Sequence, residues 1–368
     1  MPFTPNTYER ISLEITEYAE ELILYAIRQQ RRIAVSLANN PDLTVNEMQE
    51  LILLQRQWES FINRAEEWMD TELAEMYKKG LESGGQTGVR AGAFVAIGAI
   101  IPNVPSQPIS HKAAAILADY PAHHTMYGVF KQAADNALRA TYLPVVRQQQ
   151  DRIRQIVTQV SETAYRTADT LTRRQLSQEL ITQFINEGFT GIRYSNGRRV
   201  QLDSYSEMTA RTQTMQASNQ ARWNRLQERG KDLIVISVHY PCSDLCEPHQ
   251  GRVHSITGEI PGYPTLEGAI GEGVFRPNCK HSSSEYTEGD ELPERDIDTE
   301  TNREMYQAQQ KQRYNERGIK GWKRREAGAL TDTEQKKAKS KVKEWQAKQR
   351  KLIDENEFLR RSYHREKI

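Results

Sequence analysis

The apolar residues of the amino-terminal part of the chain recur at helical spacing, but they are too sparse to build a large core of their own. Over residues 8–37, apolar side chains follow one another at steps of three, four and one among glutamates and arginines, which predicts an amphipathic helix. These side chains are Ile11, Ile15, Tyr18, Leu22, Tyr25 and Ala26. Thr44 and Glu47 then form a capping box that starts a second helix ending near residue 79. Residues 1–85 are therefore predicted to form a helical hairpin.

The next segment, residues 86–187, combines an apolar, proline-rich stretch with a long helical region. The apolar run Ala91–Ile101 is 11 residues long and ends at Pro102, whereas a bilayer-spanning helix needs about 20 residues. We expect a buried helix or a glycine-rich packing segment there and no stable membrane span. A polar helical region follows from residue 126, with a possible break at Pro144. Such polar helices suit packing against neighbouring chains. Because only 37% of all residues in the chain are apolar, an elongated, multi-part molecule is expected.

Short strand-like runs appear in residues 188–290. Asn196 and Gly197 lie between two of them and predict a hairpin turn, because both residue types tolerate positive φ. A helix is expected over residues 204–229, followed by a nearly continuous apolar strand, Leu233–Val238, buried on both faces. The predicted fold class is α+β, predominantly helical, with a small α+β domain at 188–290.

All three cysteines and four of the eight histidines lie within residues 239–281. The odd number of cysteines argues against a disulfide framework. The acidic start of the chain lacks the basic and apolar regions of a secretory signal, so the protein is expected to stay in the cytoplasm where it is made. Thiolate and imidazole are preferred zinc ligands, and the side chains fall on two loops about thirty residues apart. The predicted structural zinc ligands are Cys242, Cys246, Cys279 and His281, with His239 or His249 as a replacement for Cys246.

Two other interpretations of the same residues remain open. The cysteines can be small buried hydrophobic residues, and the histidines can close turns. Alternatively, a cysteine and a histidine can form a nucleophile and a base, with Asp244 or Glu247 orienting the histidine. The sequence around them contains no oxyanion-stabilising motif, phosphate loop or paired-carboxylate signature, so no catalytic residues are assigned.

The two ends of the chain carry opposite charge. Residues 1–90 contain 9 Lys+Arg against 15 Asp+Glu, whereas residues 311–368 contain 19 against 9. A basic helical arm is predicted for residues 291–368, and its cations suit DNA phosphates, an acidic protein surface or simple solvation. Trp322 and Trp345 are expected to pack against helices rather than to stack on bases.

The order of motifs in residues 237–281 resembles the signature of phage minor capsid proteins encoded beside the portal gene, which are distantly similar to the Mu F-like head morphogenesis proteins. The matching positions are Ser237 and His239, Cys242 and Cys246, Gln250 to Val253, Tyr263 to Leu266, and Pro277 to His281. The resemblance covers about residues 180–350. Two features depart from the pattern: Arg276 replaces a histidine common in the family, and three residues rather than two separate the first cysteine pair.

The resemblance implies a non-enzymatic structural protein of low copy number, in the virion and inside the capsid near the portal vertex. Its expected roles are head morphogenesis, DNA packaging or DNA ejection. Its expected partners are the portal protein and capsid proteins, with packaged double-stranded DNA as a further partner of the basic arm. The alternative is a phage-borne zinc-dependent hydrolase or nuclease-like effector delivered with the DNA.

Overall fold

The computed structural model describes residues 13–39, most of 56–83, 109–132, isolated positions between 135 and 200, and all of 201–368. The chain divides into two compact units. The first unit comprises Met1–Ile15, Arg64–Leu138 and Ser206–Tyr306, and the second comprises Thr16–Asn63, Arg139–Tyr205 and Gln307–Ile368. Each unit therefore combines segments that are distant in sequence.

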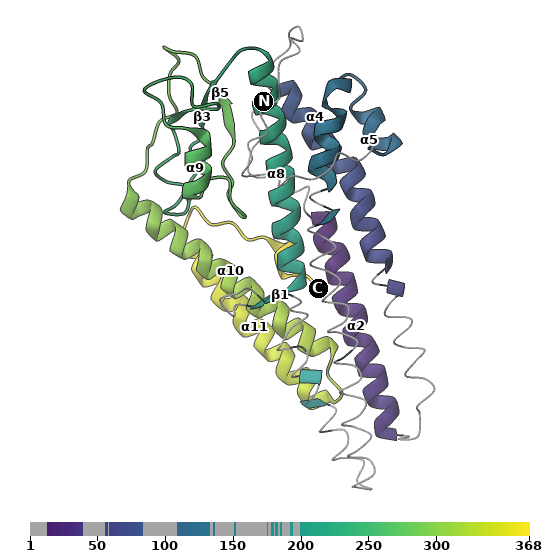
Figure 1. The fold of residues 1–368 in the computed structure, drawn as a ribbon. Helices are drawn as coiled ribbons and strands as arrows, with labels where there is room; N and C mark the ends of the chain where they lie inside the picture. The colour runs from purple at the N-terminus through teal and green to yellow at the C-terminus, as the bar shows by residue number, and fades with distance from the viewer. Residues whose placement is uncertain are drawn as a thin grey trace. The chain divides into compact units, whose positions relative to one another are not determined.

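The first unit contains a small sheet and several helices (Figure 1). Its elements are the π-helical turn η1 (Met69–Leu73), α4 (Ala74–Ser83), α5 (His111–Ile116), the 3-10 turn η2 (Pro121–His123), most of α8 (Leu202–Glu228), β3 (Leu233–Ile236), β4 (Val253–Ser255), α9 (Leu266–Glu272), β5 (Ser283–Glu285) and the start of α10 (Thr299–Ala327). The second unit contains α2 (Leu13–Asn39) from Thr16 onward, β1 (Ile192–Arg193), β2 (Arg199–Val200), α11 (Asp332–Asp354), the 3-10 turn η3 (Tyr363–Glu366), the start of α8 and the rest of α10.

The sheet of the first unit has the order β4-β3-β5, with both pairings antiparallel. Ile234 and Ile236 of the central strand join a buried cluster with Trp223 of α8, whereas Leu233 and Val235 join a second cluster. Successive strand residues point to opposite faces, so β3 is covered on both sides. This confirms the predicted burial on both faces for Leu233–Ile236, and the strand ends two residues before the predicted Val238.

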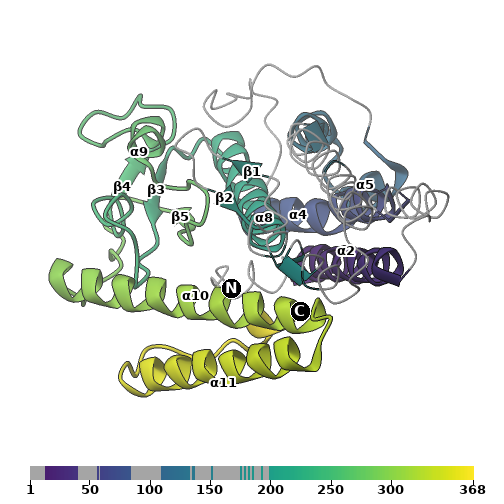
Figure 2. The ribbon, with the colours of Figure 1, turned by 90° about the horizontal axis from the view of Figure 1, so that it is seen from below.

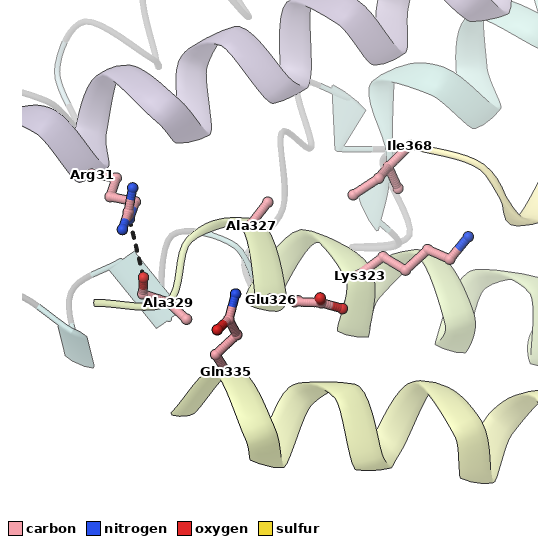
Figure 3. Close-up of a pocket in the computed structure, with 7 residues that line it drawn as sticks. All are labelled: Arg31, Lys323, Glu326, Ala327, Ala329, Gln335 and Ile368. Atoms are coloured by element: carbon pink, nitrogen blue, oxygen red, sulfur yellow. Dashed lines mark hydrogen bonds between the residues drawn. The ribbon is translucent and has the colours of Figure 1, made fainter. Parts of the chain in front are cut away.

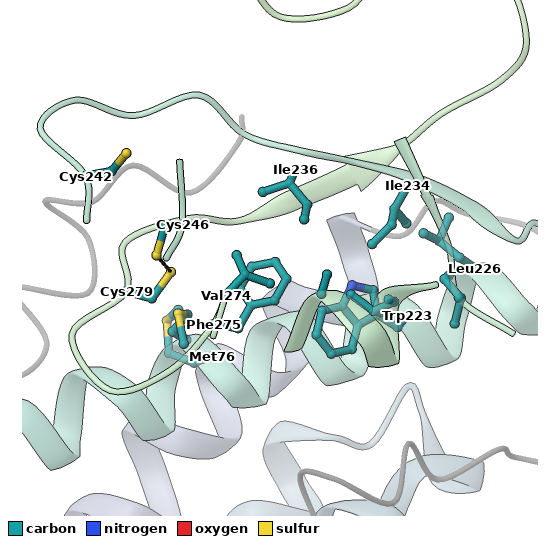
Figure 4. Packing of buried hydrophobic residues seen from close by; sticks show 14 residues of the cluster. Met76, Trp223, Leu226, Ile234, Ile236, Cys242, Cys246, Val274, Phe275 and Cys279 are labelled. Carbon is teal, nitrogen blue, oxygen red and sulfur yellow. Dashed lines mark hydrogen bonds between the residues drawn. The ribbon is translucent and has the colours of Figure 1, made fainter. Parts of the chain in front are cut away.

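Helix α8 supplies the platform beneath the sheet. Trp223 is 1% exposed, donates a hydrogen bond of 2.8 Å from Nε1 to Ser283 Oγ, and packs edge-on against Phe275 (Figure 4). On the α4 side, a Cβ added to Gly80 would lie 2.4 Å from the backbone oxygen of Ser218, so only glycine permits this approach. The observed helix, residues 202–228, agrees with the prediction for 204–229.

In the second unit, α10 and α11 lie side by side in both orientations (Figures 1 and 2). The ring of Trp345 packs on the backbone of α10 at Gly318, where an added Cβ would come within 2.5 Å of the indole, and it contacts Tyr314 edge-on. Thr331 caps the start of α11 by accepting a hydrogen bond from the N–H of Glu334. Trp345 therefore has the expected helix-packing role.

Four buried charged residues of the second unit form an ionic quartet: Glu20, Asp203, Lys320 and Arg324. Lys320 Nζ contacts Glu20 and lies 2.9 Å from Asp203, and Arg324 Nη2 lies 2.8 Å from Glu20 and 3.2 Å from Asp203. Burial and the neighbouring Asp203 raise the pKa of Glu20. Burial also acts to raise the pKa of Asp203, but Arg324 and Lys320 outweigh it, and the pKa lies well below its usual value.

The fold class is confirmed: the protein is α+β and predominantly helical. Strands β1 and β2 pair antiparallel on either side of the predicted Asn196-Gly197 turn. The Thr44 capping box, the Ala91–Ile101 run, Pro144 and most of the predicted helix to residue 187 lie outside the described residues. Within the described part of the chain, no helix is long and apolar enough to cross a membrane. The domain boundaries predicted along the sequence remain predictions.

Candidate metal centre

Two loops of the first unit carry the predicted ligands. The first follows β3 and folds back on it, since Gly251 N–H donates to Ile236 O at 2.8 Å and Ile236 N–H donates to Arg252 O at 3.1 Å. Gly251 has φ of +70°, which explains the glycine of the Gln-Gly-Arg motif. The second loop precedes β5, and its Asn278 adopts φ of +70°, a conformation that asparagine tolerates better than most residues.

Three of the predicted ligands form a buried ligand cluster: Cys246, Cys279 and His281. Their ligand atoms all lie within 4.8 Å of one another. The two Sγ atoms are 3.8 Å apart, and Cys279 Sγ lies 3.3 Å from Nδ1 of His281. The loops after β3 and before β5 thus meet through side chains that suit a soft or borderline metal ion.

The thiols of the ligand cluster titrate as a pair. Hydrogen bonding to Cys279 lowers the pKa of Cys246 to about 4, and hydrogen bonding to Cys246 together with burial raises the pKa of Cys279 well above its usual value. The pair therefore loses its first proton readily and holds its second. A thiolate is the form of cysteine that binds metal or acts as a nucleophile.

Cys242 lies outside the ligand cluster. Its side chain projects away from the other two thiols in Figure 4, and Asn302 of α10 holds its backbone. Asn302 Oδ1 accepts a hydrogen bond of 2.9 Å from Cys242 N–H, and its Nδ2 donates to Cys242 O at 3.2 Å. Burial raises the pKa of Cys242 to about 12, so it stays a thiol.

The two alternate histidines occupy different surroundings. His249 Nδ1 lies 3.4 Å from His254 Nε2, and His249 Nε2 lies 3.1 Å from a carboxylate oxygen of Glu272, so His249 belongs to a separate polar group. His239 lies beside His281 instead, with ring centroids 6.0 Å apart. Burial lowers the pKa of His239 to about 3, which keeps its ring neutral.

The sequence interpretation gave no role to two residues that hold these loops. Gln250 Oε1 accepts from the backbone N–H of His239 and lies 3.2 Å from Nε2 of His281, and Asn302 holds Cys242. Both side chains are 0% exposed. Gln250 lies within the Gln-Gly-Arg-Val motif, so its place in an ordered series of motifs was an available signal. Asn302 is one polar residue in a long polar helix, and nothing in its local sequence distinguishes it.

A pocket in the second unit has different chemistry (Figure 3). It is lined by Arg31, Lys323, Glu326, Ala327, Ala329, Gln335 and Ile368. Arg31 donates a hydrogen bond of 3.1 Å from Nε to Ala329 O, so its guanidinium is engaged in holding α2 to the turn after α10. This lining contains none of the predicted metal ligands.

Comparison with known proteins identifies the family. The sequence model of the family described as phage minor capsid protein 2 matches residues 17–354. A structural protein of Lactococcus phage LL-H is 31% identical over 182 residues, which cover 46% of this chain and 49% of that protein, so the match spans about half of the relative's length. A structural protein of Lactococcus phage mv4 is 36% identical over 111 residues, which cover 29% of this chain and 86% of that protein. No solved structure matches the chain. Because the family match extends over most of its length, this protein belongs to the phage minor capsid protein 2 family.

Proposed function

We propose that this phage structural protein is a low-copy component inside the capsid near the portal vertex, where it aids head morphogenesis, DNA packaging or DNA ejection. The observation that carries the proposal is the family match over residues 17–354. The motif series in residues 237–281, similar to that of minor head proteins encoded beside the portal gene, supports the location. Its proposed protein partners are the portal protein and the capsid proteins.

The test of this proposal is a phage with the gene deleted, together with a count of the protein per particle. A portal-proximal minor protein is needed for infectious particles but not for the shell lattice, so mutant heads should assemble and infect poorly. Cross-linking of wild-type particles should join the protein to the portal protein. A count of hundreds of copies per head would contradict the proposed location.

Within the carboxy-terminal arm, one face of α11 is the proposed surface for binding DNA. Lys336, Lys343 and Arg350 are exposed and seven residues apart, about two helical turns, so they share a face. Lys320 and Arg324 are buried in the ionic quartet and are not available to phosphates. DNA phosphates attract such exposed cations without regard to base sequence.

A charge-matched pair of variants tests DNA binding. The test variant replaces Lys336, Lys343 and Arg350 by Gln. The control replaces Lys341, Lys348 and Lys351 by Gln as well. The ammonium groups of these three residues contact Glu344 and Glu355. For duplex binding, the slope of log K against log salt should become shallower by about 2–3 in the test variant. The change in slope should be smaller in the control. Equal effects, or none, would remove this face of α11 as a DNA surface.

The alternative function, a zinc-dependent hydrolase or nuclease, is not favoured, because the matching family is one of structural capsid proteins. A catalytic zinc site keeps a coordination position open for water or substrate. Assay of the purified chain on duplex and single-stranded DNA with added zinc separates the two functions. The structural proposal expects no turnover.

A further inference from the structure

The spacing of the ligand cluster matches the edges of a zinc tetrahedron. Zinc bonds of about 2.3 Å to sulfur and about 2.0 Å to nitrogen place two sulfur ligands about 3.8 Å apart, and a sulfur and a nitrogen about 3.5 Å apart. The observed separations are 3.8 Å between Cys246 and Cys279 and 3.3 Å between Cys279 and His281 Nδ1. The three donors therefore already stand close to the positions that one ion requires.

Gln250 fixes the ring of His281 in the form that a metal needs. Gln250 Oε1 accepts a hydrogen bond of 3.1 Å from the backbone N–H of His239, and this donor can face only an oxygen. The same Oε1 lies 3.2 Å from His281 Nε2, so Nε2 must carry the proton. In the neutral ring, the lone pair of His281 is then on Nδ1, which faces the thiols. In zinc sites, the far nitrogen of a ligating imidazole regularly donates to a carboxylate, a backbone carbonyl or water, and the amide oxygen of Gln250 is an acceptor in the same position.

His239 is the best-placed fourth ligand. Its Nε2 is buried and has no hydrogen-bond partner, and its ring lies beside that of His281. The hydrogen bond to Gln250 is made by the backbone N–H of His239 and so does not occupy its Nε2. His239 is not among the three residues whose ligand atoms already lie within 4.8 Å of one another, so its ring must turn toward them to bind the same ion. Cys242 is a weaker choice, because its side chain projects away from the other two thiols (Figure 4) and its Sγ lies 3.7 Å from Nδ2 of Asn302.

We propose that Cys246, Cys279, His281 and His239 bind one Zn²⁺ ion in a closed, structural site that joins the loop after β3 to the loop before β5. Two thiolates and two neutral imidazoles complete a tetrahedral set, and binding releases the thiol protons to solvent. This inference is independent of the proposed position near the portal. It assigns Cys242, the first cysteine of the sequence motif, to packing.

Metal content and cobalt substitution of the full-length chain test the site. Protein purified under reducing conditions should contain about one zinc per chain. After replacement by Co²⁺, the sulfur-to-cobalt absorption should have the intensity of two thiolates, and the visible bands should be those of a tetrahedral site. Absence of stoichiometric zinc, or an intensity that corresponds to three thiolates, would overturn the proposal.

Variants separate the ligands from their neighbours. Cys279→Ser and His281→Ala should lose stoichiometric metal, and His239→Ala should weaken zinc affinity at least tenfold. Gln250→Leu should weaken it by about 10–100-fold while the cobalt spectrum keeps two thiolates, because Gln250 positions a ligand and does not bind. Cys242→Ser is the matched control and should retain zinc. Loss of metal in Cys242→Ser with full retention in His239→Ala would refute the fourth-ligand assignment.

Discussion

The ionic quartet of the second unit and the ligand cluster of the first unit both bury polar side chains from separate segments, but they balance charge differently. In the quartet, Glu20 and Asp203 meet Lys320 and Arg324, so two carboxylates face two cations. In the ligand cluster, the two thiols contact each other, and Nδ1 of His281 lies 3.3 Å from Cys279 Sγ. The quartet supplies its own counter-charges, whereas the ligand cluster presents sulfur and nitrogen atoms that can bind a metal cation.

This difference bears on what each cluster needs from outside the chain. A buried ion pair is tolerated when the opposite charge and further hydrogen bonds are present, and it becomes costly when one partner is removed. A group of soft donors instead gains stability from a cation. The quartet is therefore an internal link among α2, α8 and α10, and the ligand cluster is the place where we proposed an added ion.

Removal of one cation from the quartet should have the largest effect. Arg324→Met leaves Glu20 and Asp203 buried with Lys320 alone, and we expect a loss of about 3–5 kcal/mol in the stability of the second unit. A chain of two units need not unfold in one step, so the measurement is hydrogen exchange by segment. Protection should fall in α2 and the second half of α10 and persist in β3.

The matched control is Lys336→Met, which removes an exposed cation of α11 and should change stability by less than about 0.5 kcal/mol. Equal losses in the two variants would mean that the quartet is no more than a set of surface charges. Loss of protection in β3 would mean that the two clusters are not energetically separate.

The ligand cluster was accessible from the sequence because its residue types are rare. The chain has three cysteines and eight histidines, so their concentration in residues 239–281 stands out. The chain has 50 Lys+Arg and 49 Asp+Glu, and nothing local marks Glu20 as the partner of Lys320, 300 residues away. The sequence showed opposite charge at the two ends, but not that part of it pairs inside the molecule.

The geometry of the turn between Cys242 and Cys246 explains why their spacing did not show that only one of the two thiols joins the ligand cluster. Spacing treats the two thiols as equivalent members of one motif. In the structure, Cys246 N–H donates to Ser243 O at 2.9 Å, and the tight turn directs the two side chains apart (Figure 4). In contrast, β3 and α8 were predictable, because a buried strand and a long helix leave strong local patterns.

An intermediate effect is expected where α10 holds the loop of Cys242. Asn302→Leu removes two hydrogen bonds and leaves the buried N–H and C=O of Cys242 unpaired, which should cost about 1–3 kcal/mol. Hydrogen exchange of residues 239–252 should increase, and α2 and the quartet should be unaffected. Arg303→Leu, at an exposed neighbouring position, is the control and should leave the loop protected. Unchanged protection in Asn302→Leu would show that the first loop is held without α10.

The smallest effect should come from Glu344, which repeats the local chemistry of Glu20 at the surface. Its carboxylate lies 2.7 Å from Lys341 Nζ and 3.0 Å from Lys348 Nζ, just as Glu20 meets two cations, but its side chain is 44% exposed. Hydrogen bonds from Lys341 and Lys348 lower the pKa of Glu344, yet water and salt screen such pairs, and ordering the long side chains offsets the attraction. Glu344→Gln should therefore leave the exchange of α11 unchanged at low and high salt, whereas Glu20→Gln, which strands a cation in the quartet, should increase the exchange of α2. If α11 lost as much protection as α2, burial would not be what distinguishes the quartet from an ordinary surface pair.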